Sequence, residues 1–214
     1  MYTGREQIIA LCVRSTESMN TTTPMTAREI GELEDDGFRY ELIAGELIRM
    51  PPAKPLHSRI AFVFAKRPAN FVDPLELGMV LESSAGYRFE EDPDTVLAPD
   101  VSFIRRERLS ATMDWNDYFR ITPHIAFEVR SPSECRAQIE RKVRNYLDSG
   151  VLLVIFADSD KRQLTLCATN QPPRVLTGDD VLSFEDIVPG FSIAVADLFT
   201  LPAWLQPLTN GTGR

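Results

Sequence analysis

The sequence predicts an α/β domain in which helices flank a mixed β-sheet, and three observations point to this class. Residues 125–129 form a short apolar strand, apolar residues then recur at helical spacing as far as Gly150, and 151–157 is an unbroken apolar run. Such a strand–helix–strand unit of about 30 residues predicts a crossover between two parallel strands. A hairpin pattern at 40–49 adds antiparallel pairing. The composition, 43% hydrophobic and 25% charged, is that of a globular protein with a core.

The chain of 214 residues is expected to hold one domain, with a short segment outside the domain at each terminus. Residues 1–24 have no convincing period and finish in a polar run, so we expect a flexible lead-in there. Residues 25–200 are expected to form the domain, and residues 201–214 a tail. The formal net charge of −8 argues against indiscriminate binding to nucleic acids, because such binding depends on Lys and Arg.

The chain shows no sign of a membrane segment. Its longest apolar stretch near the start, residues 8–13, is far short of the roughly 20 residues that a membrane span needs, and no secretory cleavage pattern follows it. The three cysteines, Cys12, Cys135 and Cys167, include no C-x-x-C motif and cannot all pair, so we interpret them as reduced thiols. We therefore expect a cytoplasmic protein without membrane contact.

The first elements of the domain are a short helix and a hairpin. A capping box that begins at Thr26 predicts a helix over 26–33, because its Thr and its Glu three residues later satisfy each other's backbone donors. Two strands, 40–43 and 46–49, then flank Ala44-Gly45, which is typical of a two-residue hairpin turn.

A longer helix and two strands are expected next. Apolar spacing predicts a helix over 56–71, in which Pro68 should break or kink the last turns. Residues 79–89 have the composition of a strand. Residues 96–104 are interpreted as another strand, entered through Pro99.

The second half contains the strand–helix–strand unit. After the strand at 125–129, Ser131 has the place of a helix cap, with proline at the first helical position and glutamate three residues on. Gly150 ends that helix, and the apolar run at 151–157 is expected to be a strand buried on both faces. Residues 163–168 are expected to pair with it as a hairpin.

Three residues of this unit and of the strand before it are candidates for a catalytic or metal-binding role: Asp100, Glu128 and Lys142. Glu128 lies in an apolar strand, where a carboxylate is costly to bury unless it is paired or bound to metal. Asp100 and Glu128, on neighbouring strands, offer hard oxygen ligands suited to Mg²⁺ or Mn²⁺. A nearby lysine orients a water molecule or stabilises charge on a phosphate. The alternative is that both carboxylates are purely structural.

The order of the motifs along the chain resembles that of a known group of proteins. Pro99-Asp100, followed by Glu128-Val129 and the Ser-Pro-Ser after it, resembles the PD-(D/E)XK nuclease superfamily and, more narrowly, the bacterial Uma-type "putative restriction endonuclease" family. The resemblance covers about 26–200, and it implies a restriction-endonuclease-like core, a divalent metal cofactor and DNA as substrate. The other matching segments are Tyr40–Ile43 with Gly45–Leu47, Pro51-Pro52 with His57, Leu97–Phe103, Lys142–Val151, and Pro189–Phe191 with Asp197–Phe199.

Within this resemblance, Asp100 and Glu128 match the metal-binding carboxylates, and Lys142 matches a lysine that the family carries on the helix. The usual lysine of the superfamily lies two residues past the glutamate, where this chain has Arg130. Arginine stays protonated and cannot act as a base. Four residues before the helix lysine the family commonly has an aspartate, where this chain has Gln138.

Glu41 and His57 complete the catalytic candidates that the resemblance implies. Glu41 matches a family glutamate that would complete the acidic cluster, and its alternative is an edge carboxylate of the hairpin. His57 matches a position at the start of the first long helix, where it would contact a metal-bound water or a phosphate. Its alternative is a helix cap. His124, the only other histidine, is interpreted as structural.

The sequence therefore predicts a Mg²⁺- or Mn²⁺-dependent DNA endonuclease that hydrolyses phosphodiester bonds with metal-activated water. One alternative is a catalytically degenerate nuclease-fold protein that binds nucleic acid or a protein partner. Another is a structural homodimer that pairs through apolar edge strands. The chain has no Gly-rich phosphate loop, Cys/His zinc spacing or G-x-S-x-G motif, which argues against an NTPase, a zinc protein or a serine hydrolase.

Overall fold

The computed structural model describes residues 23–82, 85–131 and 134–205, so nearly all of the expected lead-in lies outside it. The helices are α2 (Ala27–Gly31), α3 (Pro55–Val72), α4 (Arg136–Asp148) and α5 (Val195–Phe199), with 3-10 turns η1 (Arg106–Arg108) and η2 (Ala203–Leu205). The strands are β1 (Arg39–Ile43), β2 (Glu46–Met50), β3 (Gly78–Glu82), β4 (Tyr87–Glu90), β5 (Thr95–Leu97), β6 (Val101–Arg105), β7 (Ile125–Val129), β8 (Leu153–Asp158), β9 (Gln163–Cys167), β10 (Arg174–Thr177), β11 (Val181–Ser183) and β12 (Ser192–Ala194).

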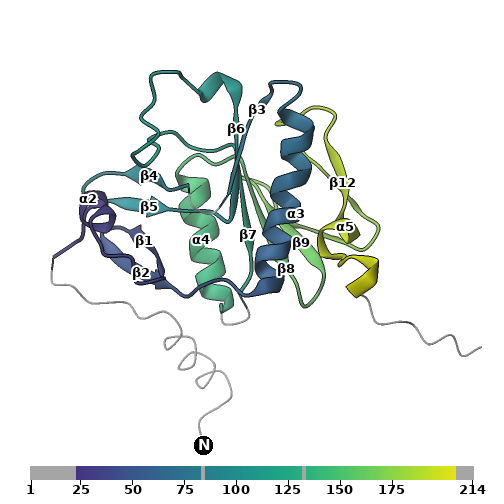
Figure 1. The fold of residues 1–214 in the computed structure, drawn as a ribbon, viewed down its shortest axis with the longest axis horizontal. Helices are drawn as coiled ribbons and strands as arrows, with labels where there is room; N and C mark the ends of the chain where they lie inside the picture. Colours follow the sequence, from purple (N-terminus) through teal and green to yellow (C-terminus); the bar gives the residue numbers. More distant parts are fainter. Residues whose placement is uncertain (1–22, 83–84, 132–133, 206–214) are drawn as a thin grey trace, which may run out of the picture.

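The main sheet is mixed, which confirms the predicted class. Its six strands have the order β10-β9-β8-β7-β6-β3, and β7 and β8 run parallel while the other neighbours run antiparallel. Helix α4 connects the two parallel strands, as the strand–helix–strand pattern predicts. A second sheet, β2-β1-β5-β4, is antiparallel, and β11 pairs with β12. Figure 1 shows α3 lying against the main sheet, with the smaller sheet to its left.

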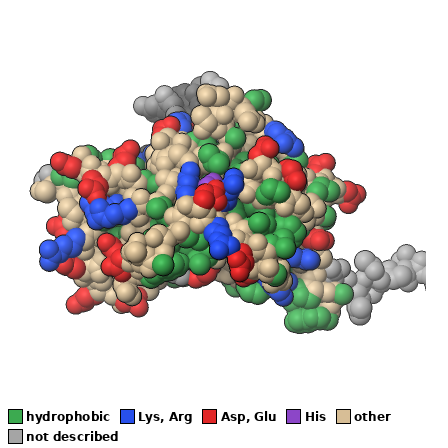
Figure 2. Space-filling model, turned by 90° about the horizontal axis from the view of Figure 1, so that it is seen from above, with side chains coloured by type: hydrophobic (Ala, Val, Ile, Leu, Met, Phe, Trp, Pro, Cys, Tyr) green, Lys and Arg blue, Asp and Glu red, His purple; other side chains and the backbone are tan. Residues whose placement is uncertain are grey.

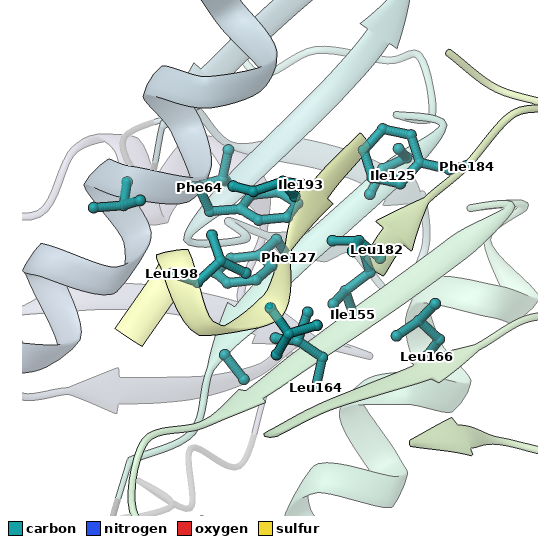
Figure 3. Close-up of a cluster of buried hydrophobic side chains, with 14 of the residues drawn as sticks. Phe64, Ile125, Phe127, Ile155, Leu164, Leu166, Leu182, Phe184, Ile193 and Leu198 are labelled. Atoms are coloured by element: carbon teal, nitrogen blue, oxygen red, sulfur yellow. The ribbon is translucent and has the colours of Figure 1, made fainter. Parts of the chain in front are cut away.

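The main sheet is covered on both faces, because successive residues of a strand point to opposite sides. Phe127 of β7 stacks on Phe64 of α3, with ring centroids 3.7 Å apart, in the large apolar cluster drawn in Figure 3. The preceding residue, Ala126, belongs instead to the cluster that contains Tyr146 of α4. Helices α3 and α4 therefore bury opposite faces of the same strand, and the residues of β7 point alternately toward each helix.

The hairpin prediction is confirmed, and the turn chemistry explains it. Strands β1 and β2 pair antiparallel with Ile43 opposite Glu46. The two residues between them, Ala44 and Gly45, have φ values of 51° and 75°. Positive φ at both central residues is the geometry that suits the right-handed twist of a tight hairpin.

Several details of these elements differ from the sequence prediction, although α3 has almost the expected bounds. Helix α3 continues through Pro68 to Val72, because Pro68 is buried against the sheet and packing outweighs the lost backbone hydrogen bond. The expected strand at 79–89 is two strands, β3 and β4. Helix α4 begins at Arg136 rather than directly after Ser131, and the side chain of Gln138 accepts the backbone N–H of Cys135 at 3.0 Å.

The expected strand at 96–104 is also divided, and this division builds part of the site. Between β5 and β6 the chain leaves the ladder, and the backbone N–H of Ala98 donates to the Glu41 carboxylate at 3.0 Å. Asp100 stands at the end of this break, directly before β6. The Glu41 side chain here accepts a backbone N–H that a neighbouring strand would otherwise accept. A local pattern of apolar residues does not reveal such a substitution.

Two further expectations concern cysteines and membranes. Cys167 is a free and buried thiol, whereas Cys135 is disulfide-bonded, so the prediction of reduced thiols is wrong at Cys135. Cys12 lies outside the described residues. None of the helices in the described part of the chain is long and apolar enough to cross a membrane.

His124 is structural in its surroundings, as the sequence analysis expects. It is 4% exposed, and its Nδ1 accepts the backbone N–H of Arg105 at 3.1 Å. Burial lowers its pKa to about 4, the charge of Arg108 and then that of Arg105 act in the same direction, and Glu107 opposes them. The imidazole is therefore neutral at physiological pH.

This low pKa predicts acid sensitivity. The unfolded chain binds a proton at His124 near pH 6.5, whereas the folded protein resists it down to about pH 4, so stability falls as pH is lowered between these values. The loss attributable to His124 is expected to reach about 3 kcal/mol. Urea unfolding of the wild type and of His124→Gln between pH 7 and 4 checks it. The free energy of unfolding of the variant should fall less steeply between pH 7 and 4 than that of the wild type. An equal dependence on pH in the two proteins would contradict the low pKa of His124.

Candidate active site

All five catalytic candidates meet where β7 ends and β6 begins. Asp100 directly precedes β6, and Glu128 is the fourth residue of β7. Glu41 comes from β1, His57 from the first turn of α3, and Lys142 from the middle of α4. Strands β6 and β7 are antiparallel neighbours, so the start of one meets the end of the other. In Figure 1 this place lies toward the lower end of the view, where the chain from β2 enters α3.

Glu128 is held from one side by α4. The Lys142 ammonium Nζ lies 2.9 Å from Glu128 Oε2, and the Tyr146 hydroxyl donates to Glu128 Oε1 at 2.6 Å. Lys142 and Tyr146 are four residues apart, so they share one face of the helix. Glu128 is 4% exposed, and this pair of contacts gives each of its oxygens a partner.

Glu41, from strand β1 of the smaller sheet, also contacts the Lys142 ammonium. Its Oε1 lies 3.9 Å from Lys142 Nζ and accepts the backbone N–H of Ala98. Glu41 is 2% exposed, and its strand lies between β2 and β5, so the carboxylate is buried and does not lie on an edge strand of the smaller sheet. It connects β1 to the break before Asp100.

Asp100 has three partners. Its Oδ2 accepts the backbone N–H of Val129 at 2.9 Å and lies 3.0 Å from His57 Nε2. Its Oδ1 lies 3.3 Å from Arg39 Nη1. His57 therefore contacts the aspartate itself, and these contacts hold the carboxylate in one orientation.

The pKa values of the two central carboxyl groups, Glu128 and Asp100, are shifted in opposite directions. Burial raises the pKa of Glu128 to about 8, the charges of Asp100 and Glu41 add to this, and Lys142 and the Tyr146 hydrogen bond oppose it. Burial would also raise the pKa of Asp100, but the hydrogen bond and charge of His57, with Lys142 and the Val129 N–H, outweigh it and keep that pKa below its ordinary value. Asp100 is therefore ionised while Glu128 retains its proton more strongly than an ordinary glutamate does.

These side chains lie in a cavity of about 600 Å³. Its walls come from β1, β2 and the chain after β2 on one side, and from β7 and α4 on the other. Arg49, Lys54 and Arg141 also line it, so cations stand around the buried acids.

Other sequence candidates lie differently. Arg130, at the place of the superfamily's usual lysine, pairs with Asp158 at 2.9 Å. Arg136 pairs with Glu140 of its own helix at 2.6 Å. Neither cation contacts Asp100 or Glu128 in the contacts described for these residues.

Sequence reasoning missed two members of the cluster, Arg39 and Tyr146. Tyr146 fits the apolar helical spacing of α4, which by itself indicates a core residue, and the only local signal for the site is its place four residues after Lys142. Arg39 gives no such local signal, because its partner Asp100 lies 61 residues away. In the part of the chain that the structure describes, no three His, Cys, Asp or Glu side chains form a ready metal-binding group.

Comparisons with known proteins agree with this fold. The Uma2 family model, described as "Putative restriction endonuclease", matches residues 27–196. Among solved structures, the chain is similar to "a putative nuclease belonging to DUF820" from Anabaena variabilis, with a TM-score of 0.71 and 20% identity over 82% of this chain and 98% of that one. A search of curated proteins finds no match.

Proposed function

Because this chain belongs to the Uma2 family, we propose that it is a metal-dependent nuclease that hydrolyses phosphodiester bonds of DNA. One observation supports this most directly: three buried carboxylates, Glu41, Asp100 and Glu128, converge with the Lys142 ammonium in an open cavity. Burying so many charges in a small space is costly for folding alone, and this cost favours a chemical purpose.

The donor set fits a hard divalent cation. Asp100 and Glu128 offer carboxylate oxygens, and Mg²⁺ commonly uses one or two carboxylates together with water and substrate phosphates. The raised pKa of Glu128 comes first from burial and then from the charges of Asp100 and Glu41, and a bound cation would lower it. When bound, the ion would polarise a phosphoryl oxygen and lower the pKa of an attacking water.

The protein's own residues have separate tasks in this proposal. Lys142 keeps a positive charge beside Glu128, where it offsets charge on the scissile phosphate. His57 and Arg39 contact both oxygens of Asp100 and orient them. Arg130 takes no part, because it is paired with Asp158.

Nicking of supercoiled plasmid with Mg²⁺ or Mn²⁺ tests the proposal. We expect Asp100→Asn to lower the cleavage rate by at least about 100-fold, because a ligand of the cation and the partner of His57 are changed together. Asp179→Asn is the matched control, because Asp179 is exposed and outside the cavity. Chelator should abolish cleavage by both active proteins. Equal cutting by Asp100→Asn would contradict the assignment of this site.

A second candidate is a nuclease-fold protein that binds nucleic acid or a protein partner without cutting. The observation that favours it is Gln138, which stands where the family commonly has an acid and whose side chain accepts the N–H of Cys135 at the start of α4. Salt-dependent DNA binding, with no cleavage by the wild type under any metal, would favour this candidate over the first.

A further inference from the structure

The cavity holds an apolar patch beside its acids, and this patch bears on the form of the DNA. The β1–β2 hairpin and the chain after it contribute five apolar side chains, here called the apolar wall: Ile43, Ile48, Met50, Pro51 and Pro52. Charged side chains of the same segments, among them Glu41 and Glu46, stand beside them. A site that only held phosphate and metal would not need the apolar wall, whereas apolar side chains suit the face of an unstacked nucleobase.

The charges of the cavity are balanced rather than positive. Arg39 lies against Asp100, Lys142 against Glu128, and Arg141 lies 3.6 Å from Glu46. The chain as a whole has a net charge of −8. The opposite end of the molecule, seen from above in Figure 2, also mixes acidic and basic side chains. A protein that tracks both strands of a duplex depends on an excess of Lys and Arg, which these surfaces do not offer.

The three carboxylate side chains of the site are also deeply buried in the protein. Glu41, Asp100 and Glu128 are 2–4% exposed, so a scissile phosphate must enter the cavity to approach them. A cavity of about 600 Å³ is of the size that buries one small ligand. An unpaired nucleotide brings its base and its phosphate together on a flexible backbone, whereas paired bases stay stacked inside the duplex.

We propose that the cavity receives one unpaired nucleotide, with its base on the apolar wall and its phosphate toward Asp100, Glu128 and Lys142. The substrate class is then single-stranded DNA, or the unpaired loops and ends of a duplex, rather than continuous duplex. This inference rests on the proposed nuclease function.

Labelled oligonucleotides of one sequence test the inference in three forms: a single strand, a blunt duplex, and a duplex with a central unpaired loop. With Mn²⁺, we expect the single strand and the loop to be cut at least about tenfold faster than the blunt duplex, with cuts of the third form inside the loop. Equal or faster cutting of the blunt duplex would overturn the inference and leave the nuclease function standing.

A matched pair of variants tests the apolar wall. Met50 lines the cavity, whereas Met113 packs in a separate cluster, and both are half-buried. We expect Met50→Ala to raise KM for the single strand about fivefold or more with little change in kcat, and Met113→Ala to leave KM unchanged. Equal KM values in the two variants would overturn the inference.

Binding of the same oligonucleotides in Ca²⁺, without turnover, separates the two proposals. Tighter binding of the single strand than of the duplex, weakened by Met50→Ala, would support the inference even if no DNA is cut and the nuclease function fails. Binding of the duplex as tightly as the single strand would overturn the inference whether or not DNA is cut.

Discussion

Replacing Lys142 by methionine is expected to destabilise the fold by about 3–5 kcal/mol and to abolish cleavage, because it leaves buried carboxylates without their cation. Lys142 is 13% exposed and lies 2.9 Å from Glu128 and 3.9 Å from Glu41. Burial lowers the pKa of this ammonium, but Glu128 and Glu41 together raise it above the ordinary value, so the lysine is charged in the folded protein. Methionine has a similar length and no charge, so the variant isolates the electrostatic part.

The dependence of this loss on pH identifies its cause. Without Lys142, the pKa of Glu128 should rise further, because the ammonium is the main group that now lowers it. A carboxyl with a raised folded pKa retains its contribution below its unfolded pKa, near 4.5, and loses it as pH rises toward the folded value. Because the wild-type pKa of Glu128 is already about 8, wild type and variant differ in this contribution only above that pH. The loss in Lys142→Met relative to the wild type should therefore be larger at about pH 9.5 than at about pH 6.

Urea unfolding at the two pH values measures this effect, and plasmid nicking measures the activity. Lys66→Met is the control, because Lys66 is an exposed residue of α3 and its replacement should change stability by less than about 0.5 kcal/mol. An equal loss, relative to the wild type, at about pH 6 and about pH 9.5 would show that lost packing, not unpaired charge, explains the result.

Replacing Phe127 by alanine is expected to cost about 3–5 kcal/mol for a different reason. Phe127 is fully buried in the cluster of Figure 3 and stacks on Phe64, with an interplanar angle of 8°. Truncation removes the ring and leaves a cavity between the sheet and α3. The next residue of β7 is Glu128, so the strand that positions the site is packed less firmly against α3.

Chemical denaturation of Phe127→Ala checks this value, with Phe62→Ala as its control on α3. Phe62 is 55% exposed, and its truncation should cost less than about 1 kcal/mol. A loss of less than about 1 kcal/mol in Phe127→Ala would contradict the packing of β7 against α3.

The elements whose cause is local can be predicted from the sequence alone. The apolar run after Gly150 predicts β8, whose last five residues are all buried, and the helical spacing before it predicts α4. The turn at Ala44-Gly45 predicts the β1–β2 hairpin, which the structure confirms. These predictions succeed because the period of a pattern reports which faces of an element are buried, and that information lies within a few residues.

The resemblance carried by the motifs placed the five site candidates in one family pattern, and the structure brings them together. Their pairing depends on how distant segments pack: Lys142 pairs with Glu128 and Glu41, and Asp100 with His57 and Arg39.

These partners are far apart in the chain, and neither apolar spacing nor propensity encodes such contacts. The same reason explains α3 continuing through Pro68 and the hydroxyl of Tyr146 reaching Glu128. Burial on the assembled sheet changes what each of these residues contributes, and that burial exists only once distant segments have packed together.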